Sequence, residues 1–301
     1  MTLPSAPDPP RASIVIRAYN EARHLPEVFA RLERQTERAF EVVLVDSGST
    51  DATARLAESA GARVVRIRKE DFTFGRSLNV GCEAARGDLL AFISGHCHPM
   101  EERWLERMLA PFADPAIGLV YGKQRGGETT KFSERRHFEK TFPETSLVPQ
   151  EGFFCNNANA AIRRELWRAR PFDEVLTGLE DLDWAKWMTG QGGRVAYAAD
   201  AGVIHLHDET WPQVFRRYER EAIALKHILP DMSFSIFEFA RLFTHSAWLD
   251  SLRAARQGIF FANFAPILAF RAMQYWGTYR GAKFDRSLTR EMKEKFFYPN
   301  R

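Results

Sequence analysis

Cysteine is scarce in this sequence, and the few cysteines are not spaced for a disulfide framework or a zinc site. Only Cys82, Cys97 and Cys155 occur among 301 residues, an odd number without a Cys-x-x-Cys pair. Neither a small disulfide-stabilised domain nor a structural zinc cage is therefore indicated. Free thiols fit a reducing cytosol best, so we expect a cytoplasmic protein, either free or at the inner face of the cytoplasmic membrane.

The sequence also lacks an excess of one charge. Its 42 Lys and Arg residues against 39 Asp and Glu residues give a formal net charge of +3, and charges of both signs are interspersed along the chain. A protein that binds nucleic acid usually carries clustered Lys and Arg, and the sequence has no such block. We therefore expect no nucleic acid partner.

Long apolar runs are absent as well. The most apolar stretch begins at Gly258 and is interrupted by Asn263 and Pro266. It is shorter than the roughly 20 residues that a membrane span needs, so the sequence predicts no membrane-spanning helix. The Pro-rich residues 1–12 contain no apolar signal core, and we interpret them as a disordered lead-in and not as a targeting segment.

The sequence does contain a regular alternation of short β-rich runs and helical patterns from Ser13 onward. The runs read SIVIR, EVVLVD, ARVVRI and DLLAFIS, and the segments between them carry apolar residues at helical spacing. This order predicts βαβ units, and hence an α/β fold with a mainly parallel central sheet flanked by helices.

Two later parts of the chain break this alternation. The polar segment at residues 123–152 is longer than an ordinary connection, so we interpret it as a functional loop region. From Trp211 onward the pattern becomes mostly helical, with Phe, Trp and Arg mixed through it. We therefore expect the lead-in at residues 1–12, an α/β domain at residues 13–210 and a C-terminal helical region at residues 211–301.

Polar residues follow the predicted strands at the edge where open α/β sheets bind ligands. Asp46 ends EVVLVD and could accept hydrogens from a nucleotide base or ribose. Alternatively, Asp46 forms a turn and Asp51 caps a helix. The stretch RAYNE, from Arg17 to Glu21, ends the first run in the same way. Arg76, on the helical segment before DLLAFIS, could neutralise a diphosphate or be an ordinary surface arginine.

Two later motifs could also support chemistry. GLEDLDWAKWM places Glu180, Asp181 and Asp183 within one turn at the start of a predicted helix, where the helix dipole alone would favour acids. Such close packing should also raise at least one pKa, which suits a general base or a metal-associated acid. In VIHLHDE, His205 and His207 are expected on one face of a strand, where two imidazoles can share a ligand.

These motifs together resemble those of glycosyltransferase family 2, the inverting enzymes with the GT-A fold, and within it the rhamnosyltransferase-like proteins of surface polysaccharide synthesis. The similarity extends from about Ser13 to Tyr279 and depends on the order and spacing of IVIRAYNEARHL, VLVDSGSTDAT, FTFGRSLNVGCEAARGD, NNANAAIRRELW, PFDEVLTGLEDLDWAKW and AYAADAGVIHLHDET. The resemblance implies a Rossmann-like GT-A domain with a C-terminal helical extension. It also implies an inverting hexosyl- or deoxyhexosyltransferase that moves a sugar from a nucleotide-sugar donor to a glycan hydroxyl, such as that of a polyprenyl-linked O-antigen or capsule precursor.

Carried over position by position, the resemblance implies roles for particular residues. Asp46 matches the acid that contacts the donor's base, and Asp181 matches the general base of the family's Glu-Asp pair, with Glu180 beside it. His205 and His207 match late histidines that reach the metal or the donor phosphates. The residues expected to bind the nucleotide-sugar are Arg17, Tyr19, Asn20, Glu21, Asp46, Ser47, Arg76, Asn79, Ser94, Gly95 and His96.

The sequence departs from the family where the Asp-x-Asp metal motif should follow LLAFI. Ser94, Gly95 and His96 stand there, without a carboxylate. A divalent cation, Mn²⁺ or Mg²⁺, is then held by imidazoles, with His96, His205 and His207 as the expected ligands, or it is not needed. Two other interpretations stay open: a protonated His96 pairs with the diphosphate directly, or His96 and His98 bond backbone groups in a turn.

Two functions from other classes compete with sugar transfer. The missing acidic motif could mark a catalytically inactive module that binds nucleotides or carbohydrates, and sugar nucleotidyltransferases have a related α/β sheet. The Glu-Asp pair and the paired histidines argue against the first, and RAYNEARHL lacks the Gly-rich phosphate loop that the second usually needs. Separately, the aromatic and basic residues from Phe260 to Lys283 predict a peripheral membrane contact or a dimer through the C-terminal helices.

Overall fold

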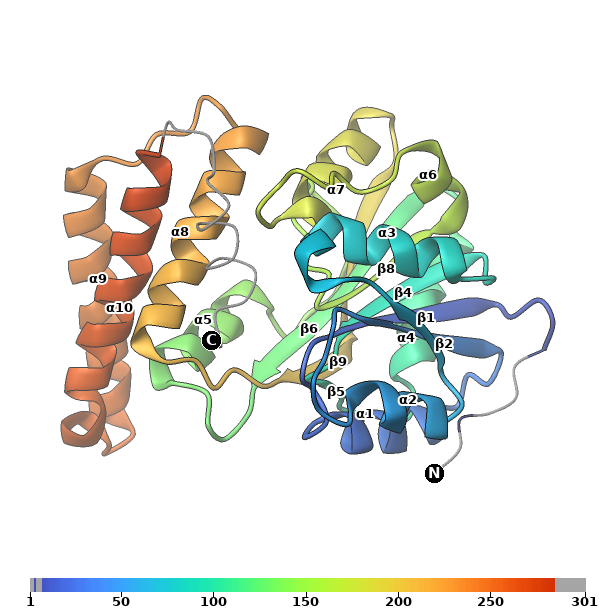
Figure 1. Ribbon diagram of the computed structural model, residues 1–301. Coiled ribbons are helices and arrows are strands. Elements are labelled where there is room, and N and C mark those ends of the chain that lie inside the picture. The colour runs from blue at the N-terminus through green and yellow to red at the C-terminus, as the bar shows by residue number, and fades with distance from the viewer. Residues whose placement is uncertain (1–2, 4–6, 285–301) are drawn as a thin grey trace. The chain divides into compact units, whose positions relative to one another are not determined.

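The computed structural model describes residue 3 and residues 7–284, which form two compact units (Figure 1). Neither unit is one continuous stretch of chain. Among the described residues, the first unit contains residue 3, residues 7–125, residues 142–175 and residues 180–205, and the second contains residues 126–141, 176–179 and 206–284.

The first unit is built around a nine-stranded sheet. Its strands are β1 (Ala12–Ala18), β2 (Phe40–Asp46), β3 (Arg63–Arg66), β4 (Leu89–Ser94), β5 (Cys97–Pro99), β6 (Ile117–Gly126), β7 (Leu147–Gln150), β8 (Asn159–Arg163) and β9 (Arg194–His205). They are ordered β3-β2-β1-β4-β8-β6-β9-β5, and β7 pairs with β9. Strands β1 to β4 are parallel, as the βαβ rhythm predicts, whereas β8 runs antiparallel to both β4 and β6. The predicted α/β fold is thus confirmed, with an antiparallel half that this rhythm did not indicate.

Strands β1, β2 and β4 are nearly continuous in buried residues because helices cover the sheet, whereas β3, at the edge of the sheet, is only partly buried. In β1 every residue except Arg17 is buried, which is the pattern of a strand with no face in solvent. Helix α1 (Leu25–Glu33) turns Leu25, Val28, Phe29 and Leu32 toward the core, at the spacing of one helix face. The other helices of this unit are α2 (Thr53–Ser59), α3 (Phe74–Ala84), α4 (Trp104–Leu109), α6 (Arg164–Ala169) and α7 (Glu180–Gly190), with short 3₁₀ helices at Lys69–Asp71 and Ala110–Ala113.

The polar segment at residues 123–152 is not the loop region expected from its composition. It contains helix α5 (Phe132–Thr141) and strand β7. The helix forms in spite of its charge because Phe132 and Phe138 are buried, and because Glu134, also buried, is paired with Arg217. A charge is rarely buried without a partner, and here that partner lies far along the sequence, so the local pattern conceals it.

Part of the predicted lead-in at residues 1–12 lies in the described chain, namely residue 3 and residues 7–12. Strand β1 begins at Ala12, which is fully buried. Leu3 donates its backbone N–H to the carbonyl oxygen of Ala60 over 2.9 Å and packs against the core. Residues 1–2 and 4–6 lie outside the described part of the chain, so disorder there stays a prediction.

The second unit contains α8 (Trp211–Ile228), α9 (Ile236–Arg256) and α10 (Phe260–Ala282) together with α5. A capping box begins α9, since Ser235 and Glu238 each accept the other's backbone N–H with a side-chain oxygen. Helix α10 lies so close to α8 that a Cβ on Gly277 or Gly281 would collide with carbonyl oxygens of α8. Among residues 7–284, no helix combines the length and the apolarity that a bilayer crossing requires.

A buried ion pair links the helices of the second unit. Arg271 on α10 lies 2.8 Å from Asp250 on α9, and both side chains are almost fully buried. The guanidinium of Arg271 also donates to the backbone carbonyl of Ser133 on α5. One buried side chain therefore connects three helices, and its charge is compensated within the unit.

Candidate active site

The carboxyl ends of β1, β2 and β4 bring several of the predicted residues to one edge of the sheet (Figure 1). In the register of these strands Ala18 lies beside Asp46, and Arg17 lies beside Ser94. The backbone continues this alignment, since Ser47 donates its N–H to the carbonyl oxygen of Ala18 over 3.0 Å. These residues are therefore neighbours at the edge where open α/β sheets bind ligands.

Asp46 and Ser47 are both buried at this edge. A carboxylate oxygen of Asp46 accepts from the N–H of Ser49 over 3.2 Å. The hydroxyl of Ser47 is buried and bonds to no other group among the described residues. An unpaired buried hydroxyl costs roughly 1–3 kcal/mol, which a ligand bonded to Ser47 would recover. The unpaired hydroxyl of Ser47 therefore favours a bound polar ligand at this edge.

Asn20 ties the loop after β1 to the loop after β2. Its φ of 56° lies in the left-handed region, which asparagine tolerates better than most residues. Its amide oxygen accepts from the N–H of Thr50 over 2.8 Å, and its own N–H donates to the hydroxyl of Ser49 over 2.9 Å. Asn20 thus holds the two loops together through hydrogen bonds within the protein. Asp51 is not the N-cap of α2, which is Ala52, but from one residue earlier its carboxylate accepts the N–H of Thr53 at the start of the helix over 2.9 Å.

Tyr19, one of the residues expected to bind the nucleotide-sugar, is accompanied by a lysine that the sequence did not indicate. The ammonium of Lys69 lies 4.7 Å from the centre of the Tyr19 ring and 2.6 Å from its hydroxyl oxygen. Lys69 begins the 3₁₀ helix after β3, and it lies so near the loop after β2 that a Cβ added at Gly48 would be 3.4 Å from the Cβ of Lys69. A cation therefore lies against the loop that follows Asp46, where a phosphate would be attracted.

The stretch SGHCHP has no acid of its own, but Glu21 supplies one from the loop after β1. Oε1 of Glu21 lies 2.7 Å from Nδ1 of His96. Gly95 makes this approach possible, because a Cβ there would lie 2.8 Å from Cγ of Glu21. A carboxylate and an imidazole thus lie together in place of two acids. The sequence concealed this arrangement because the two residues are 75 positions apart.

Cys97 and His98 lie in a strand and not in the turn that one interpretation of the sequence required. The segment Cys97–Pro99 forms β5, which pairs antiparallel with β9. Burial raises the pKa of the Cys97 thiol to about 12, so it does not offer a thiolate ligand at neutral pH. Burial, and next the charge of Arg31, lower the pKa of His98 to about 4, so its imidazole is neutral at pH 7.

His96 stacks on His205, the last residue of β9. The two ring centroids are 5.1 Å apart and the ring planes are inclined by 22°. His205 is buried, and its Nδ1–H donates to Oε1 of Gln124 over 2.8 Å. In both histidines Nδ1 faces an oxygen acceptor, the arrangement that orients metal-binding imidazoles for ligation through Nε2. His96 and His205 therefore fit a transition ion such as Mn²⁺.

His207 does not share a strand face with His205, contrary to the expectation from VIHLHDE. Strand β9 ends at His205, and His207 follows it in the second unit. There its Nδ1 lies 2.7 Å from Oε1 of Glu134, and the chain leaves the sheet to make this contact. Glu134, His207 and Glu209 place ligand atoms within 4.8 Å of one another. Arg217 pairs with both of these carboxylates, so a guanidinium already supplies the positive charge of this cluster.

Glu180 and Asp181 begin α7, and both are buried. Oε1 of Glu180 lies 3.1 Å from a guanidinium nitrogen of Arg17, which compensates its charge. Asp181 instead accepts two backbone N–H groups, from Asn157 over 2.7 Å and from Leu182 over 2.8 Å. Burial, and next the negative charge of Glu180, raise the pKa of Asp181 to about 7. A carboxylate with this pKa is suited to take a proton at neutral pH.

Two features beside Asp181 have no signal in the sequence. Leu179 has a φ of 57°, a left-handed conformation that costs a leucine roughly 1–2 kcal/mol. Strained residues of this kind are found more often at functional sites than elsewhere. Asn157 is 3% exposed, yet neither polar atom of its side-chain amide has a partner among the described residues. Such an amide can donate to and accept from a substrate hydroxyl. Asn157 is therefore a further candidate for substrate contact.

Asn79 and Arg76 on α3 have partners within the protein. The amide nitrogen of Asn79 donates to the Phe172 carbonyl and to Glu174, and its oxygen accepts from Trp167 and from the Phe172 N–H. All four hydrogen-bonding positions of this amide are used within the protein, which favours a structural role for Asn79, and its contact with a nucleotide stays a prediction. Arg76 is exposed and lies 3.3 Å from Glu174, which favours the surface interpretation.

The comparisons with known proteins point to one family, and the proteins similar to this chain include the following three. The model for glycosyl transferase family 2 matches residues 13–169. The O-antigen chain rhamnosyltransferase WbaN of Salmonella anatum is 26% identical over 221 residues, which are 69% of this chain and 70% of that protein. The undecaprenyl-phosphate 4-deoxy-4-formamido-L-arabinose transferase of Pseudomonas paraeruginosa is 39% identical over 134 residues, or 41% of this chain and 39% of that protein. The mannosyltransferase PcManGT from Pyrobaculum calidifontis, solved with GDP-Man and Mn²⁺, has a TM-score of 0.60 and 19% identity over 97% of this chain and 88% of that one.

The sheet and its polar edge, with the similarity to solved structures, define the GT-A fold of glycosyltransferases. The chain belongs to glycosyl transferase family 2. The matched residues 13–169 include the loops after β1, β2 and β4, whereas Asp181 and His205 follow the matched region.

Proposed function

We propose that this protein is an inverting glycosyltransferase that moves a hexosyl or deoxyhexosyl group from a nucleotide-sugar to a hydroxyl of a glycan acceptor. Family membership supports the transfer of a sugar. The observation that carries the proposal is Asp181, a carboxylate whose pKa is raised to about 7 by burial. Perturbed acids of this kind are characteristic of general bases.

In the proposed reaction a single displacement inverts the anomeric carbon. The acceptor hydroxyl gives its proton to Asp181 while its oxygen forms a bond to the anomeric carbon. The bond between that carbon and the diphosphate oxygen breaks, and its electron pair leaves with the nucleoside diphosphate. Arg17 supports this role because its positive charge pairs with Glu180 and lowers the pKa of Asp181, which opposes the increase that Glu180 causes.

The other side chains of this edge are proposed to hold the donor. Asp46 and Ser47 bind the nucleoside, and Lys69 attracts the diphosphate. Asn157 orients a hydroxyl of the sugar or of the acceptor beside Asp181. A divalent cation, when held by the imidazoles of the site, would neutralise the charge that develops on the leaving diphosphate.

The sugar and acceptor are proposed from the similar proteins. One is named as an O-antigen chain rhamnosyltransferase and another as an undecaprenyl-phosphate sugar transferase. We therefore propose a deoxyhexosyl donor, with rhamnose as the first candidate, and an acceptor glycan linked to a polyprenyl carrier. His207, the third expected metal ligand, stays a proposal of the same kind.

The transfer assay uses purified full-length protein, a set of nucleotide-hexoses and nucleotide-deoxyhexoses, and a polyprenyl-linked oligosaccharide. Release of nucleoside diphosphate together with a lengthened acceptor supports the proposal. Coupling constants at the new anomeric carbon report whether the configuration is inverted. Nucleotide binding without release would identify the inactive module, and pyrophosphate made from a sugar phosphate and a nucleoside triphosphate would identify a nucleotidyltransferase.

A further inference from the structure

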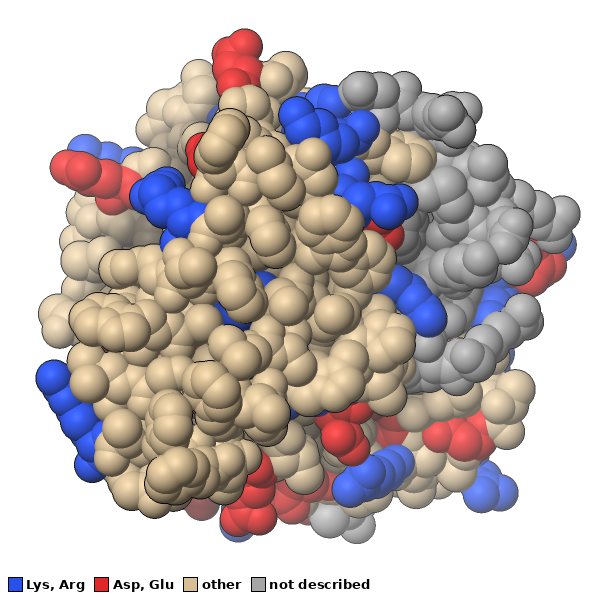
Figure 2. All heavy atoms as spheres, turned by 90° about the vertical axis from the view of Figure 1, so that its left-hand side faces the viewer, with Lys and Arg blue, Asp and Glu red and all other residues tan. Residues whose placement is uncertain are grey.

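The second unit exposes large apolar side chains on α9, on α10 and on the loop between them. Phe261 is 96% exposed, Phe237 is 82% exposed and Trp248 is 62% exposed. The others are Ile236, Leu249, Leu252, Ile259, Phe264 and Trp276. Figure 2, which views this side of the molecule, shows a broad face almost free of charged side chains, which lie at its margin. Contiguous apolar faces of this kind mark sites of interaction.

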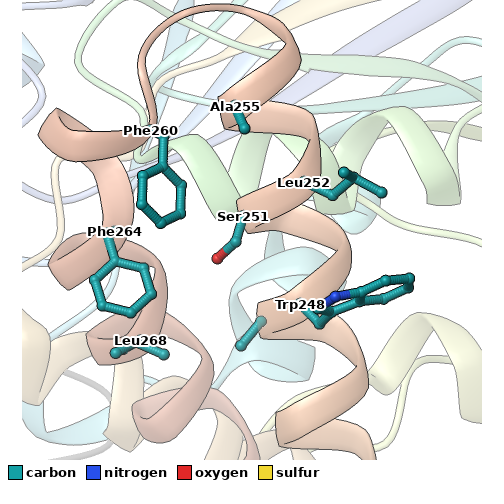
Figure 3. Close-up of a pocket in the computed structure, with 8 residues that line it drawn as sticks. Trp248, Ser251, Leu252, Ala255, Phe260, Phe264 and Leu268 are labelled. Atoms are coloured by element: carbon teal, nitrogen blue, oxygen red, sulfur yellow. The ribbon is translucent and has the colours of Figure 1, made fainter.

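An apolar groove of about 400 Å³ opens on this face between α9 and α10 (Figure 3). Trp248 and Leu252 line it from α9, and Phe260, Phe264 and Leu268 line it from α10. The rings of Phe260 and Phe264 lie 5.1 Å apart, and Figure 3 shows them directed toward the space between the helices. Its walls are almost entirely hydrocarbon, so the groove suits an alkyl chain and not a polar ligand.

The charges on these two helices are strongly biased toward one sign. Between residues 236 and 283 the exposed cations are Arg241, Arg253, Arg256, Arg280 and Lys283. The acids in that range are Glu238 and Asp250, and Asp250 is buried against Arg271. Five exposed cations therefore stand against one acid, Glu238, on the elements that carry the apolar face. This surface is complementary to a negatively charged partner that is also apolar.

We propose that the face formed by α9 and α10 binds the surface of an anionic lipid bilayer. Phe237, Trp248 and Phe261 enter the boundary between headgroups and acyl chains, and one acyl chain enters the groove. The surrounding arginines contact anionic headgroups, each contributing to attraction near the surface. A second copy of the chain fits less well, because a two-fold contact through this face would bring the same excess of positive charge against itself.

This membrane contact goes beyond the proposed transfer reaction. None of the proposed catalytic or donor-binding side chains lies on α9 or α10, so each proposal can fail while the other holds. If both hold, the contact keeps the enzyme on the surface that carries a lipid-linked acceptor. The test therefore uses vesicles without any glycan lipid.

The experiment is flotation of the full-length protein with vesicles of phosphatidylcholine alone or with 30% phosphatidylglycerol, about a third anionic as in a charged leaflet. We expect the protein to float with the anionic vesicles at physiological salt and to bind neutral ones at least about tenfold more weakly. Replacing both Phe237 and Phe261 with Ser should weaken binding at least about tenfold, because each substitution removes an aromatic side chain that the bilayer would cover. The variant Arg253→Gln/Arg256→Gln should weaken it about thirtyfold, from roughly 1 kcal/mol for each cation.

The matched control is Val175→Ser, because Val175 is 77% exposed and lies in the first unit. This variant should float like the wild type. Circular dichroism and nucleotide binding of every variant show whether the fold is kept. Absence of the wild-type protein from the floating fraction, or equal binding by the double phenylalanine variant, would overturn the proposal. So would a concentration-dependent dimer in sedimentation velocity that Phe237→Ser/Phe261→Ser abolishes.

Discussion

Replacing Asp181 with Asn tests whether its carboxyl group holds a proton that an ordinary aspartate would release. The folded protein raises the pKa of Asp181 from 3.8 to about 7, first through burial and next through Glu180. Between about pH 4 and pH 7 the folded chain therefore keeps this proton while the unfolded chain has lost it. The free energy of unfolding must then fall as the pH rises through that window, and change no further above about pH 7.

The size of the effect follows from the pKa shift. The interval from pH 5 to the folded pKa of about 7 is about 2 pH units, and each unit contributes about 1.36 kcal/mol. The free energy of unfolding of the wild type should therefore fall by about 3 kcal/mol between pH 5 and pH 8 because of this group. Asn does not titrate, so the variant Asp181→Asn lacks this loss. Asn also cannot accept from both the Asn157 and the Leu182 N–H as the carboxylate does, which costs a constant amount of roughly 1–3 kcal/mol at either pH.

The measurement is urea unfolding of the wild type and Asp181→Asn at pH 5 and pH 8, followed by circular dichroism. Asp200→Asn is the control, because Asp200 is an exposed carboxylate on β9. The difference between wild type and Asp181→Asn should change by about 3 kcal/mol between the two pH values, and the control should change little. An unchanged difference would mean that Asp181 is already ionised at pH 5. In the transfer assay, kcat/KM of the wild type should fall about tenfold per unit below pH 7, and Asp181→Asn should lose about 100- to 10,000-fold.

Three further substitutions test other parts of the structure. Arg17→Met removes the guanidinium that lowers the pKa of Asp181, so the acid limb of the pH–rate profile should move upward by about 1 pH unit or more. An acid limb that does not move would show that Arg17 does not influence the proton affinity of Asp181. Glu21→Gln should weaken activation by Mn²⁺ about 10- to 100-fold in EDTA-treated enzyme, whereas full wild-type activity in EDTA would remove the metal from the mechanism. Asp250→Ala leaves the buried Arg271 unpaired and should cost about 3–5 kcal/mol of stability in chemical denaturation, which the double variant Asp250→Leu/Arg271→Met should largely restore; a single-variant loss below about 1 kcal/mol would show that the pair is not buried in solution.

The elements that the sequence predicted well are those whose pattern is local. Strands β1, β2 and β4 are short apolar runs covered by helices, and α1 carries its apolar stripe at helical spacing. Asp46 was found because it ends a strand of this kind. Helix α5 was missed because Glu134 is buried against a distant arginine, which local composition cannot reveal. The strand face expected for His207 was wrong because β9 ends at His205, and nothing in VIHLHDE marks that end, whereas its role as a metal ligand stays a prediction.

The sequence by itself determined the family, the parallel half of the sheet and the positions of the acids, because motif order, alternation and strand ends are all read along the chain. Only the tertiary structure decided what these residues can do. Glu21 becomes the partner of His96 because two strand ends meet at one edge of the sheet. The carboxylates of Glu180 and Asp181 are both buried, but Glu180 faces Arg17, whereas Asp181 accepts backbone N–H groups. A carboxylate's proton affinity depends on burial and on neighbouring charges, and both are set by residues far away in the sequence.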